Sequence, residues 1–426
     1  MKRDNQTPEN DIPAEWRSGR EGMFIKFAQE LSAWPETGKE PETADRGTKY
    51  YLDLQEKRLK RHGLELRHKL ELYDLPVVQI RGALGDMLNP YEKTMHFCSC
   101  HYTKKLLRGG RKVYAKKRDT TLYETIGEPT AESWAAGEML CSCPNCGAVS
   151  TIRELTNVGC RYCKTHFIAS ELYPKVTNFY QLDSYDRKKI LSTVKLISAL
   201  CAAAGLVYGF FNGGGENIIE RILIAALSAG AGALFGYVAF SILLLIWVLI
   251  KAVLSIPLLG SVRGSGGSRR KLTKRLQKFD PSFTYDYITS KALSLYGTIA
   301  FSDDPGSLNQ FDGVRPERYE DLVDTAYRGT VRINEVGKEG KDLAVELELY
   351  LSSIYDRPGR LRAKNERVKM RLTHRADRLL NADFNIHAVR CPSCGVGFDA
   401  VKARRCPYCG TDYRAEWEDW VVTDIS

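Results

Sequence analysis

The chain has 426 residues, of which 27% are charged and 43% hydrophobic, and its formal net charge is +10 at pH 7. This length leaves room for two or three domains. The net charge is moderate and much of it flanks the apolar runs described below, which suits anionic inner-leaflet lipid and disfavours nucleic acid as the partner.

The N-terminal 20 residues are polar and charged, so we expect a disordered segment without a cleavable signal peptide. Residues 21–182 are expected to form an α+β domain. Its amphipathic pattern predicts a helix over Met23–Ala33 that ends before Pro35, and helix-like spacing of apolar residues continues from Tyr50 to about Leu70.

A strand and a β-hairpin are predicted next. The apolar run Leu75–Ile80 indicates the strand, and two further runs flank Arg108-Gly109-Gly110, whose composition is typical of a hairpin turn. Cys98 and Cys100 share one face of the first hairpin strand. We interpret them as small buried residues, with a metal or redox role as the alternative.

Eight of the 12 cysteines form four C-x-x-C pairs, which define two modules at residues 141–166 and 391–410. Two such turns point four thiolates at one tetrahedral metal ion, which leaves no open position for catalysis. The sequence therefore predicts two structural zinc sites. Their ligands would be Cys143, Cys146, Cys160 and Cys163 in the first module, and Cys391, Cys394, Cys406 and Cys409 in the second.

Two long apolar runs, Ile190–Phe211 and Ile222–Ile250, predict a transmembrane hairpin within residues 187–260. A buried helical pair in a soluble domain is the alternative. The second run exceeds one perpendicular span, so we expect it to tilt, or the stretch Ser241–Gly260 to re-enter the membrane.

Basic residues flank both ends of this hairpin, and the turn between the runs has few charges. The positive-inside rule then places both termini in the cytoplasm and the protein in the inner (plasma) membrane. The predicted thiolate ligands favour the same reducing compartment. G-x-x-x-G spacing at Gly205 and Gly209, and again at Gly232 and Gly236, favours packing of the two helices on each other over assembly of a homo-oligomer.

Residues 261–278 form a basic juxtamembrane linker. We weigh a surface helix on anionic lipid equally against a solvated linker. The candidate lipid-binding residues are Arg269, Arg270, Lys271, Lys274, Arg275 and Lys278.

A second α+β domain is predicted over residues 279–426, with a leading helix, a short helix near Arg318–Val323, several strands, the second cysteine module and a closing strand. The first half has the same layout, which indicates an internal repeat. In both halves the cysteine module would be inserted in the last β-hairpin. The expected fold class is thus α+β, with two cone-like domains of helices and a curved antiparallel sheet, joined by the transmembrane hairpin.

The second half resembles the translocase of inner membrane 44-like family, on the basis of Phe279-Asp280-Pro281-Ser282-Phe283 opening a helix, the order of helix then strands, and the closing segment Trp417–Ile425. Some bacterial members are similar in also having zinc ribbons and membrane helices. The resemblance implies a cone-shaped fold of the nuclear transport factor 2-like type around a pocket. It does not carry motor tethering to this chain, which adds a ribbon and integral spans.

These features favour a membrane-anchored scaffold without catalysis, which binds a protein segment, anionic lipid or both. An enzyme or small-molecule binder that uses a cone pocket is the alternative, with Asp303, Asp304, His374 and His387 as its candidate polar groups. Nucleic-acid binding by the ribbons, through Arg161, Arg404 and Arg405, is a second alternative.

Overall fold

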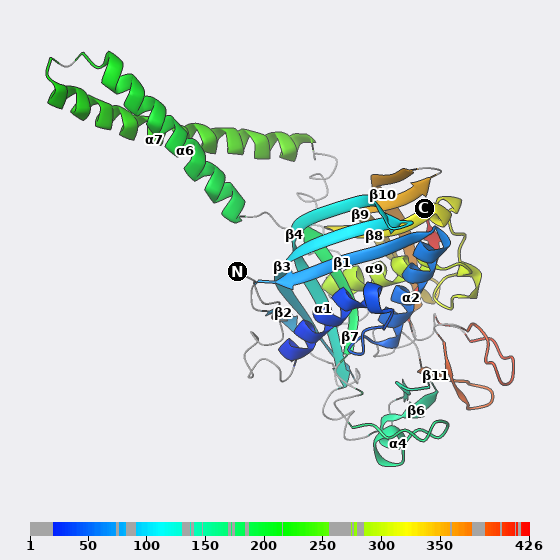
Figure 1. Cartoon of the computed structure of the whole chain (residues 1–426). Coiled ribbons are helices and arrows are strands. Elements are labelled where there is room, and N and C mark those ends of the chain that lie inside the picture. The colour runs from blue at the N-terminus through cyan, green and yellow to red at the C-terminus, as the bar shows by residue number, and fades with distance from the viewer. Residues whose placement is uncertain are drawn as a thin grey trace. The chain divides into compact units, whose positions relative to one another are not determined.

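The segments on either side of the apolar runs build antiparallel sheets with the same strand order (Figure 1). The computed structural model describes residues 20–73, 76–81, 91–129, 137, 140–146, 148–168, 172, 175–183, 187–214, 216–254, 274, 277–278, 285–357, 360–376, 388–400, 403–413, 415 and 419–426. The chain separates into a main unit, Met1–Ser184 with Gly267–Ser426, and a hairpin unit, Tyr185–Gly266. Within the main unit we call residues 20–183 the N-terminal half and residues 285–426 the C-terminal half.

The N-terminal half begins with the helices α1 (Arg20–Thr37) and α2 (Arg46–Arg61), and its sheet has the order β1-β3-β4-β7, with β2 paired to β3. Its strands are β1 (Leu64–Leu72), β2 (Val77–Arg81), β3 (Tyr91–Arg108), β4 (Arg111–Pro129) and β7 (Lys175–Asp183). A short helix, α4 (Ile152–Asn157), lies in the cysteine module of this half. Gly109 and Gly110 join β3 to β4 with φ values of 55° and 75°. Two consecutive positive values are the signature of a two-residue I′ hairpin turn, which confirms the predicted hairpin.

The helix-like pattern predicted as far as Leu70 is wrong beyond Arg61. Gly63 at φ 61° ends α2, and β1 follows directly. In β1 the buried leucines alternate with exposed charged residues, so its period is two. The high charge of this segment concealed that alternation. Helix α1 also continues two residues past Pro35, whose ring lies in the last turn.

The C-terminal half has the helix α9 (Tyr285–Phe301), two 3₁₀ turns, η3 (Pro305–Ser307) and η4 (Glu317–Asp321), and a sheet in the order β13-β10-β9-β8. Its strands are β8 (Leu322–Glu339), β9 (Asp342–Arg357), β10 (Arg360–Arg375) and β13 (Val421–Ile425). In each half, a cysteine module lies in the chain between the last two strands of the main sheet, β4 and β7 in the N-terminal half and β10 and β13 in the C-terminal half. The modules contain the short hairpins β5 (Leu140–Ser142) with β6 (Val149–Thr151), and β11 (Ala388–Arg390) with β12 (Gly397–Asp399).

The two halves match in backbone detail as well as in strand order. Val176 in β7 exchanges hydrogen bonds with the backbone of Thr43 and Asp45, and Val422 in β13 does the same with Gln310 and Asp312. The next residue in each strand is a threonine at a β-bulge. The Thr177 hydroxyl donates to the carbonyl of Thr125 at 3.1 Å, and the Thr423 hydroxyl donates to the carbonyl of Arg371 at 3.4 Å. These shared features confirm the internal repeat.

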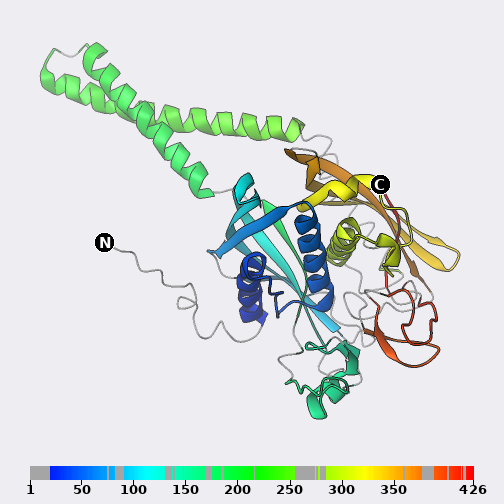
Figure 2. The same cartoon turned by 45° about the vertical axis from the view of Figure 1, so that its right-hand side comes forward.

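Helices α2 and α9 pack together between the halves, and both contact strands of both sheets (Figure 2). Leu54 of α2 belongs to the core of the C-terminal half, whereas Val323 and Ile354 belong to the core of the N-terminal half. The side chain of Arg58, which is fully buried, donates to the carbonyl groups of Phe301 and Ser302 at the end of α9. The halves therefore share their cores.

The hairpin unit consists of α6 (Arg187–Asn212) and α7 (Ile218–Leu254). Both contain spans that are long and apolar enough to cross a membrane, Ser192–Asn212 and Ile218–Leu243, and only 6% and 11% of these spans is buried. A Cβ atom at Gly205 would lie 2.2 Å from the carbonyl oxygen of Ser228, and one at Gly232 would lie 2.3 Å from that of Cys201. The glycine-spaced faces are thus occupied by close packing of α6 on α7.

Candidate functional site

Each cysteine module brings four sulfur atoms together. All Sγ atoms within a module lie within 4.8 Å of one another. The Sγ atoms of Cys143 and Cys163 are 3.6 Å apart, and so are those of Cys146 and Cys160. In the second module Cys391–Cys409 is 3.6 Å and Cys394–Cys406 is 3.7 Å. A tetrahedral zinc ion with Zn–S bonds of about 2.3 Å has sulfur–sulfur edges of about 3.8 Å, so both modules fit a four-coordinate metal.

The backbone fixes these sulfurs through the same turn at each described C-x-x-C pair. The N–H of Cys143 donates to the carbonyl of Ala148, and the N–H groups of Cys160, Cys391 and Cys406 donate to the carbonyls five residues ahead, at 2.7–2.9 Å in all four. The residue after the second cysteine has a positive φ at Lys164, Gly395 and Gly410. The ligand geometry is therefore set by local chain direction.

A threonine hydroxyl also reaches one sulfur in each module. Sγ of Cys163 is hydrogen-bonded to the hydroxyl of Thr165 at 3.3 Å, and Sγ of Cys409 to the hydroxyl of Thr411 at 3.2 Å. These hydrogen bonds lower the pKa of each thiol to about 6. A low pKa favours the thiolate, which is the form that binds a metal.

The two modules pack against each other. Strand β5 contacts β11, and β6 contacts β12. A Cβ atom at Gly397 would lie 2.8 Å from Cγ1 of Val149, so this contact requires glycine. Tyr162 and Tyr408 stand third in their C-x-x-C pairs, and a hydrogen bond between their side chains raises the pKa of Tyr408. Both side chains are more than 60% exposed, so the paired modules present aromatic rings to the surface.

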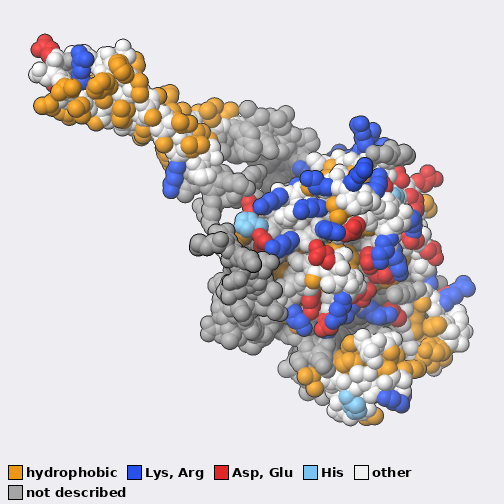
Figure 3. Space-filling model, viewed as in Figure 1, with side chains coloured by type: hydrophobic (Ala, Val, Ile, Leu, Met, Phe, Trp, Pro, Cys, Tyr) orange, Lys and Arg blue, Asp and Glu red, His pale blue; other side chains and the backbone are white. Residues whose placement is uncertain are grey.

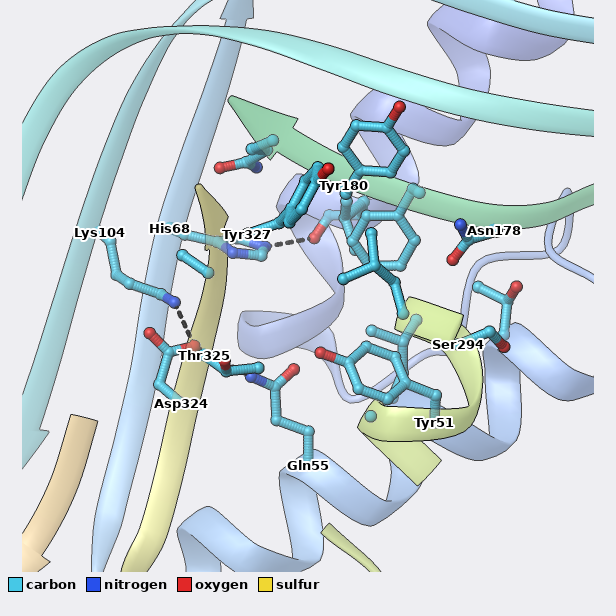
Figure 4. Close-up of a pocket in the computed structure, with 18 of the residues that line it drawn as sticks. Tyr51, Gln55, His68, Lys104, Asn178, Tyr180, Ser294, Asp324, Thr325 and Tyr327 are labelled. Atoms are coloured by element: carbon cyan, nitrogen blue, oxygen red, sulfur yellow. Dashed lines mark hydrogen bonds and ion pairs between the residues drawn. The ribbon is translucent and has the colours of Figure 1, made fainter. Parts of the chain in front are cut away.

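A second candidate site is a cavity of about 120 Å³ between the two halves (Figure 4). It is lined by α1, α2, β1, β3, β4 and β7 of the N-terminal half and by α9, β8 and β9 of the C-terminal half. Lys104 and Asp324 form an ion pair at its edge with an Nζ–Oδ1 distance of 2.5 Å. Gln55 donates to the same Asp324 oxygen at 3.2 Å.

The protonation states of the cavity follow from these contacts. Burial alone lowers the pKa of Lys104, but attraction to the Asp324 carboxylate outweighs it and raises that pKa overall. Burial raises the pKa of Tyr51 and of Tyr102. At neutral pH, Lys104 is therefore an ammonium ion, and both phenols are protonated.

His68 is neutral, and its tautomer is fixed. Pro35 has no N–H, so the carbonyl of Leu31 lacks its helical donor and accepts from Nε2 of His68 at 2.6 Å. The hydroxyl of Tyr102 lies 3.5 Å from Nδ1, where it donates. Burial lowers the pKa of His68 to about 4. Both ring nitrogens are thus engaged.

The structure brings together all eight predicted cysteine ligands. Of the candidate lipid-binding residues, Lys274 and Lys278 are exposed, and Arg269, Arg270, Lys271 and Arg275 lie outside the described residues. Cys98 and Cys100 are buried in β3, and Cys100 Sγ lies 3.1 Å from the hydroxyl of Thr120. Among the described residues, no third group of metal ligands converges.

The predicted polar groups of a pocketed enzyme are not assembled in the cavity. Asp303 pairs with Arg58 and Arg61, and His374 is buried beside Trp420. His387 is outside the described residues. The predictions missed Lys104, Asp324 and His68. Pro35 indicated that the carbonyl of Leu31 lacks its helical donor, but nothing in the sequence indicated that His68 lies beside this carbonyl.

Comparisons with protein-family models, with curated proteins and with solved structures found no match for this chain. The resemblance to the translocase of inner membrane 44-like family therefore stays a prediction. The geometry described above carries the functional argument.

Proposed function

We propose that this protein is a membrane-anchored binding protein without catalysis, in which two zinc-stiffened α+β halves on the cytoplasmic face hold a protein segment. One observation carries the membrane anchor. Among the described residues, most of the exposed large apolar side chains lie between Leu196 and Ile246 of α6 and α7. Such a surface is stable only where lipid or protein covers it, and its length suits a bilayer.

The cysteine geometry supports zinc as a structural ion. Four thiolates at tetrahedral spacing complete the coordination of zinc and leave no position for substrate. Zinc would fasten each module and, through the contact of β5 and β6 with β11 and β12, the pair of modules. We therefore propose that both zinc ions stabilise the fold and take no part in catalysis. The resemblance of the C-terminal half to the translocase of inner membrane 44-like family remains part of this proposal.

The cavity supports binding over catalysis. A general base needs a pKa near the operating pH. Lys104 has a raised pKa, and His68 has a pKa of about 4 with both nitrogens engaged. Neither group is suited to accept a proton from a substrate at neutral pH.

The exposed face of the cysteine modules supports a protein segment as the ligand. Val158, Tyr162, Ile168 and Tyr408 are each more than 60% exposed, and Figure 3 shows apolar side chains gathered over this part of the main unit. Aromatic residues are enriched at the centres of protein interfaces. Anionic lipid would be a secondary contact through the basic residues Arg269–Lys278.

Proximity labelling in the native cells tests this function, with the labelling enzyme fused to the C-terminus of the full chain. We expect labelling on the cytoplasmic side and a small, reproducible set of proteins. The double variant Tyr162→Ser/Tyr408→Ser should lose that set and remain in the membrane, whereas Tyr73→Ser, at an exposed tyrosine of the N-terminal half, should keep it. Labelling on the opposite side, or a protein set unchanged by the double variant, would contradict the proposal.

A further inference from the structure

The charges of the β3–β4 hairpin are concentrated at one end. The 16 residues nearest its turn, 103–118, include eight Lys or Arg residues and no Asp or Glu. The remote parts of the same two strands, residues 91–102 and 119–129, include four acidic residues and one Lys. The turn end of the hairpin is therefore strongly positive, and such a surface attracts an anionic partner.

Half of these eight cations are exposed and available to a partner. Lys104, by contrast, is paired with Asp324 and lines the cavity. Because successive residues of a strand point to opposite faces, Lys105 lies on the outer face of the sheet. The four exposed cations form no ion pair in the part of the chain that the structure describes; they are Lys105, Arg111, Lys112 and Lys117. Figure 3 shows Lys and Arg side chains gathered over the part of the main unit that contains β3 and β4.

The C-terminal half extends this positive surface. Arg108 pairs with Asp356 at 2.6 Å, which brings the β9–β10 turn beside the β3–β4 turn, and β4 contacts β10. Around the β9–β10 turn, three exposed arginines form no ion pair among the described residues. We call the seven cations of the two turns the basic end: Lys105, Arg111, Lys112, Lys117, Arg357, Arg360 and Arg362.

The covalent chain keeps the basic end near the proposed membrane anchor. Strand β7 is antiparallel to β4 and ends at Asp183, opposite Thr120, so its direction is toward the β3–β4 turn. Helix α6 begins at Arg187, only four residues later. Four residues of extended chain span at most about 14 Å. The start of the anchor is therefore within that distance of the end of β7, whatever the arrangement of the two units.

The composition of the basic end suits a lipid surface better than a nucleic acid. Val113, which is 43% exposed, lies among the cations. Cations with an interspersed apolar side chain are typical of segments that lie at the headgroup boundary of a bilayer. Single-stranded nucleic acids instead bind where aromatic rings accompany the cations. The one aromatic residue of 103–118, Tyr114, packs against the core of the N-terminal half.

We propose that the basic end docks on the anionic cytoplasmic leaflet, so that the main unit lies against the bilayer. This inference rests on the proposed membrane anchor, and it adds a folded contact to that of the linker residues Arg269–Lys278. Each cation near an anionic leaflet strengthens such a contact about 5-fold. The first cysteine module follows the opposite end of β4, so docking would leave Tyr162 and Tyr408 free for a protein partner.

The test uses the full chain in lipid nanodiscs, made of phosphatidylcholine alone or of phosphatidylcholine mixed with phosphatidylserine. A neutral acetylating reagent modifies exposed lysines, and mass spectrometry gives the rate at each one. Lys105, Lys112 and Lys117 should react at least 5-fold more slowly in the anionic nanodiscs. Lys164, exposed in the first cysteine module, should react at the same rate in both. Salt at about 0.5 M should remove the difference, because it screens exposed charges.

Two matched double variants locate the contact. Arg111→Gln/Lys112→Gln removes two cations of the basic end and leaves Lys105 and Lys117 as reporters, whose rates in the two kinds of nanodisc should then agree within 2-fold. Arg332→Gln/Lys338→Gln removes two exposed cations of β8 and should keep the full protection at Lys105 and Lys117. The second variant has the same net charge as the first, so it separates a local contact from a general effect of charge.

Equal rates in the two kinds of nanodisc, or unchanged protection in Arg111→Gln/Lys112→Gln, would overturn the proposal. Protection of these lysines by single-stranded RNA, and not by anionic lipid, would assign the surface to nucleic acid and overturn it as well. Insertion of the chain into neutral nanodiscs tests the anchor separately. A chain that inserts without protection of these lysines contradicts only the docking, whereas a chain that does not insert contradicts the proposed function.

Discussion

The ammonium of Lys104 and the carboxylate of Asp324 are 220 positions apart in the chain and 2.5 Å apart in the fold. One residue lies on β3 and the other on β8, so the ion pair joins the N-terminal and C-terminal halves. Both side chains are nearly removed from water, at 12% and 7% exposure. The pair is therefore part of the interface that makes one unit of the two repeats.

We predict that Asp324→Asn destabilises the main unit by about 3 kcal/mol, because the buried ammonium of Lys104 loses its counter-ion. Asp53→Asn is the matched control, since Asp53 pairs with an exposed Lys57 at 2.8 Å and should cost less than about 1 kcal/mol. Urea denaturation of the full chain in detergent, followed by its tryptophan fluorescence, measures both, because Trp34 and Trp420 are buried in the two cores of the main unit. Equal effects of the two variants would show that the Lys104–Asp324 ion pair does not stabilise the interface between the halves.

A buried carboxyl group on β4 gives a prediction about pH. Glu124 is fully buried opposite His96, and neither of its side-chain oxygens has a hydrogen-bond partner in the described part of the chain. Burial raises the pKa of Glu124 well above the usual value. The folded state therefore keeps a proton that the unfolded state releases above about pH 4.3, and stability is lost as the pH rises.

Glu124→Gln replaces this protonated acid with a neutral side chain of similar shape. We expect the variant to be more stable than the natural chain at pH 8, by more than about 1 kcal/mol, and the difference to shrink as the pH falls to 5. Denaturation curves at pH 5, 6.5 and 8 measure it. A difference that is constant with pH would mean that Glu124 is ionised in the folded protein.

The amount of bound metal tests each cysteine module independently. Cys146→Ser and Cys394→Ser should each reduce bound zinc from about two ions per chain to about one, because each removes one of four ligands. Cys201→Ser, in α6, should keep both ions. Mass spectrometry of the purified chain counts the metal. Two ions in either ligand variant, or iron in place of zinc, would contradict the assignment.

The success of sequence reasoning depended on how local each feature is. The cysteine modules were predictable because a C-x-x-C turn fixes its own geometry, as the repeated hydrogen bonds at Cys143, Cys160, Cys391 and Cys406 show. The β3–β4 hairpin was predictable from Gly109 and Gly110 for the same reason. The apolar helices follow from composition alone.

Features that depend on distant pairing were not predictable. His68 is a cavity residue only because β1 runs past the end of α1, where Pro35 leaves the carbonyl of Leu31 unpaired. Lys104 and Asp324 meet only after two sheets have formed. The repeat was inferred from layout, yet the matched bulges at Thr177 and Thr423 need strand registers that no single sequence discloses.

The packing of α6 on α7 can be tested with two neighbouring glycines. A Cβ atom at Gly232 would clash with the carbonyl oxygen of Cys201 at 2.3 Å, whereas one at Gly230 would meet nothing within 4 Å. We expect Gly232→Val to push the helices apart and to raise the rate of Cys201 alkylation by maleimide in detergent several-fold. Gly230→Val, the same change on an open face of α7, should leave the rate unchanged. Chemical cross-linking gives a second measurement. If Gly230→Val abolished a cross-linked dimer and Gly232→Val retained it, the face of α7 at Gly230 would be the contact between two copies of the chain. Equal alkylation of both variants and the natural chain would show that the close approach at Gly232 does not hold the hairpin together.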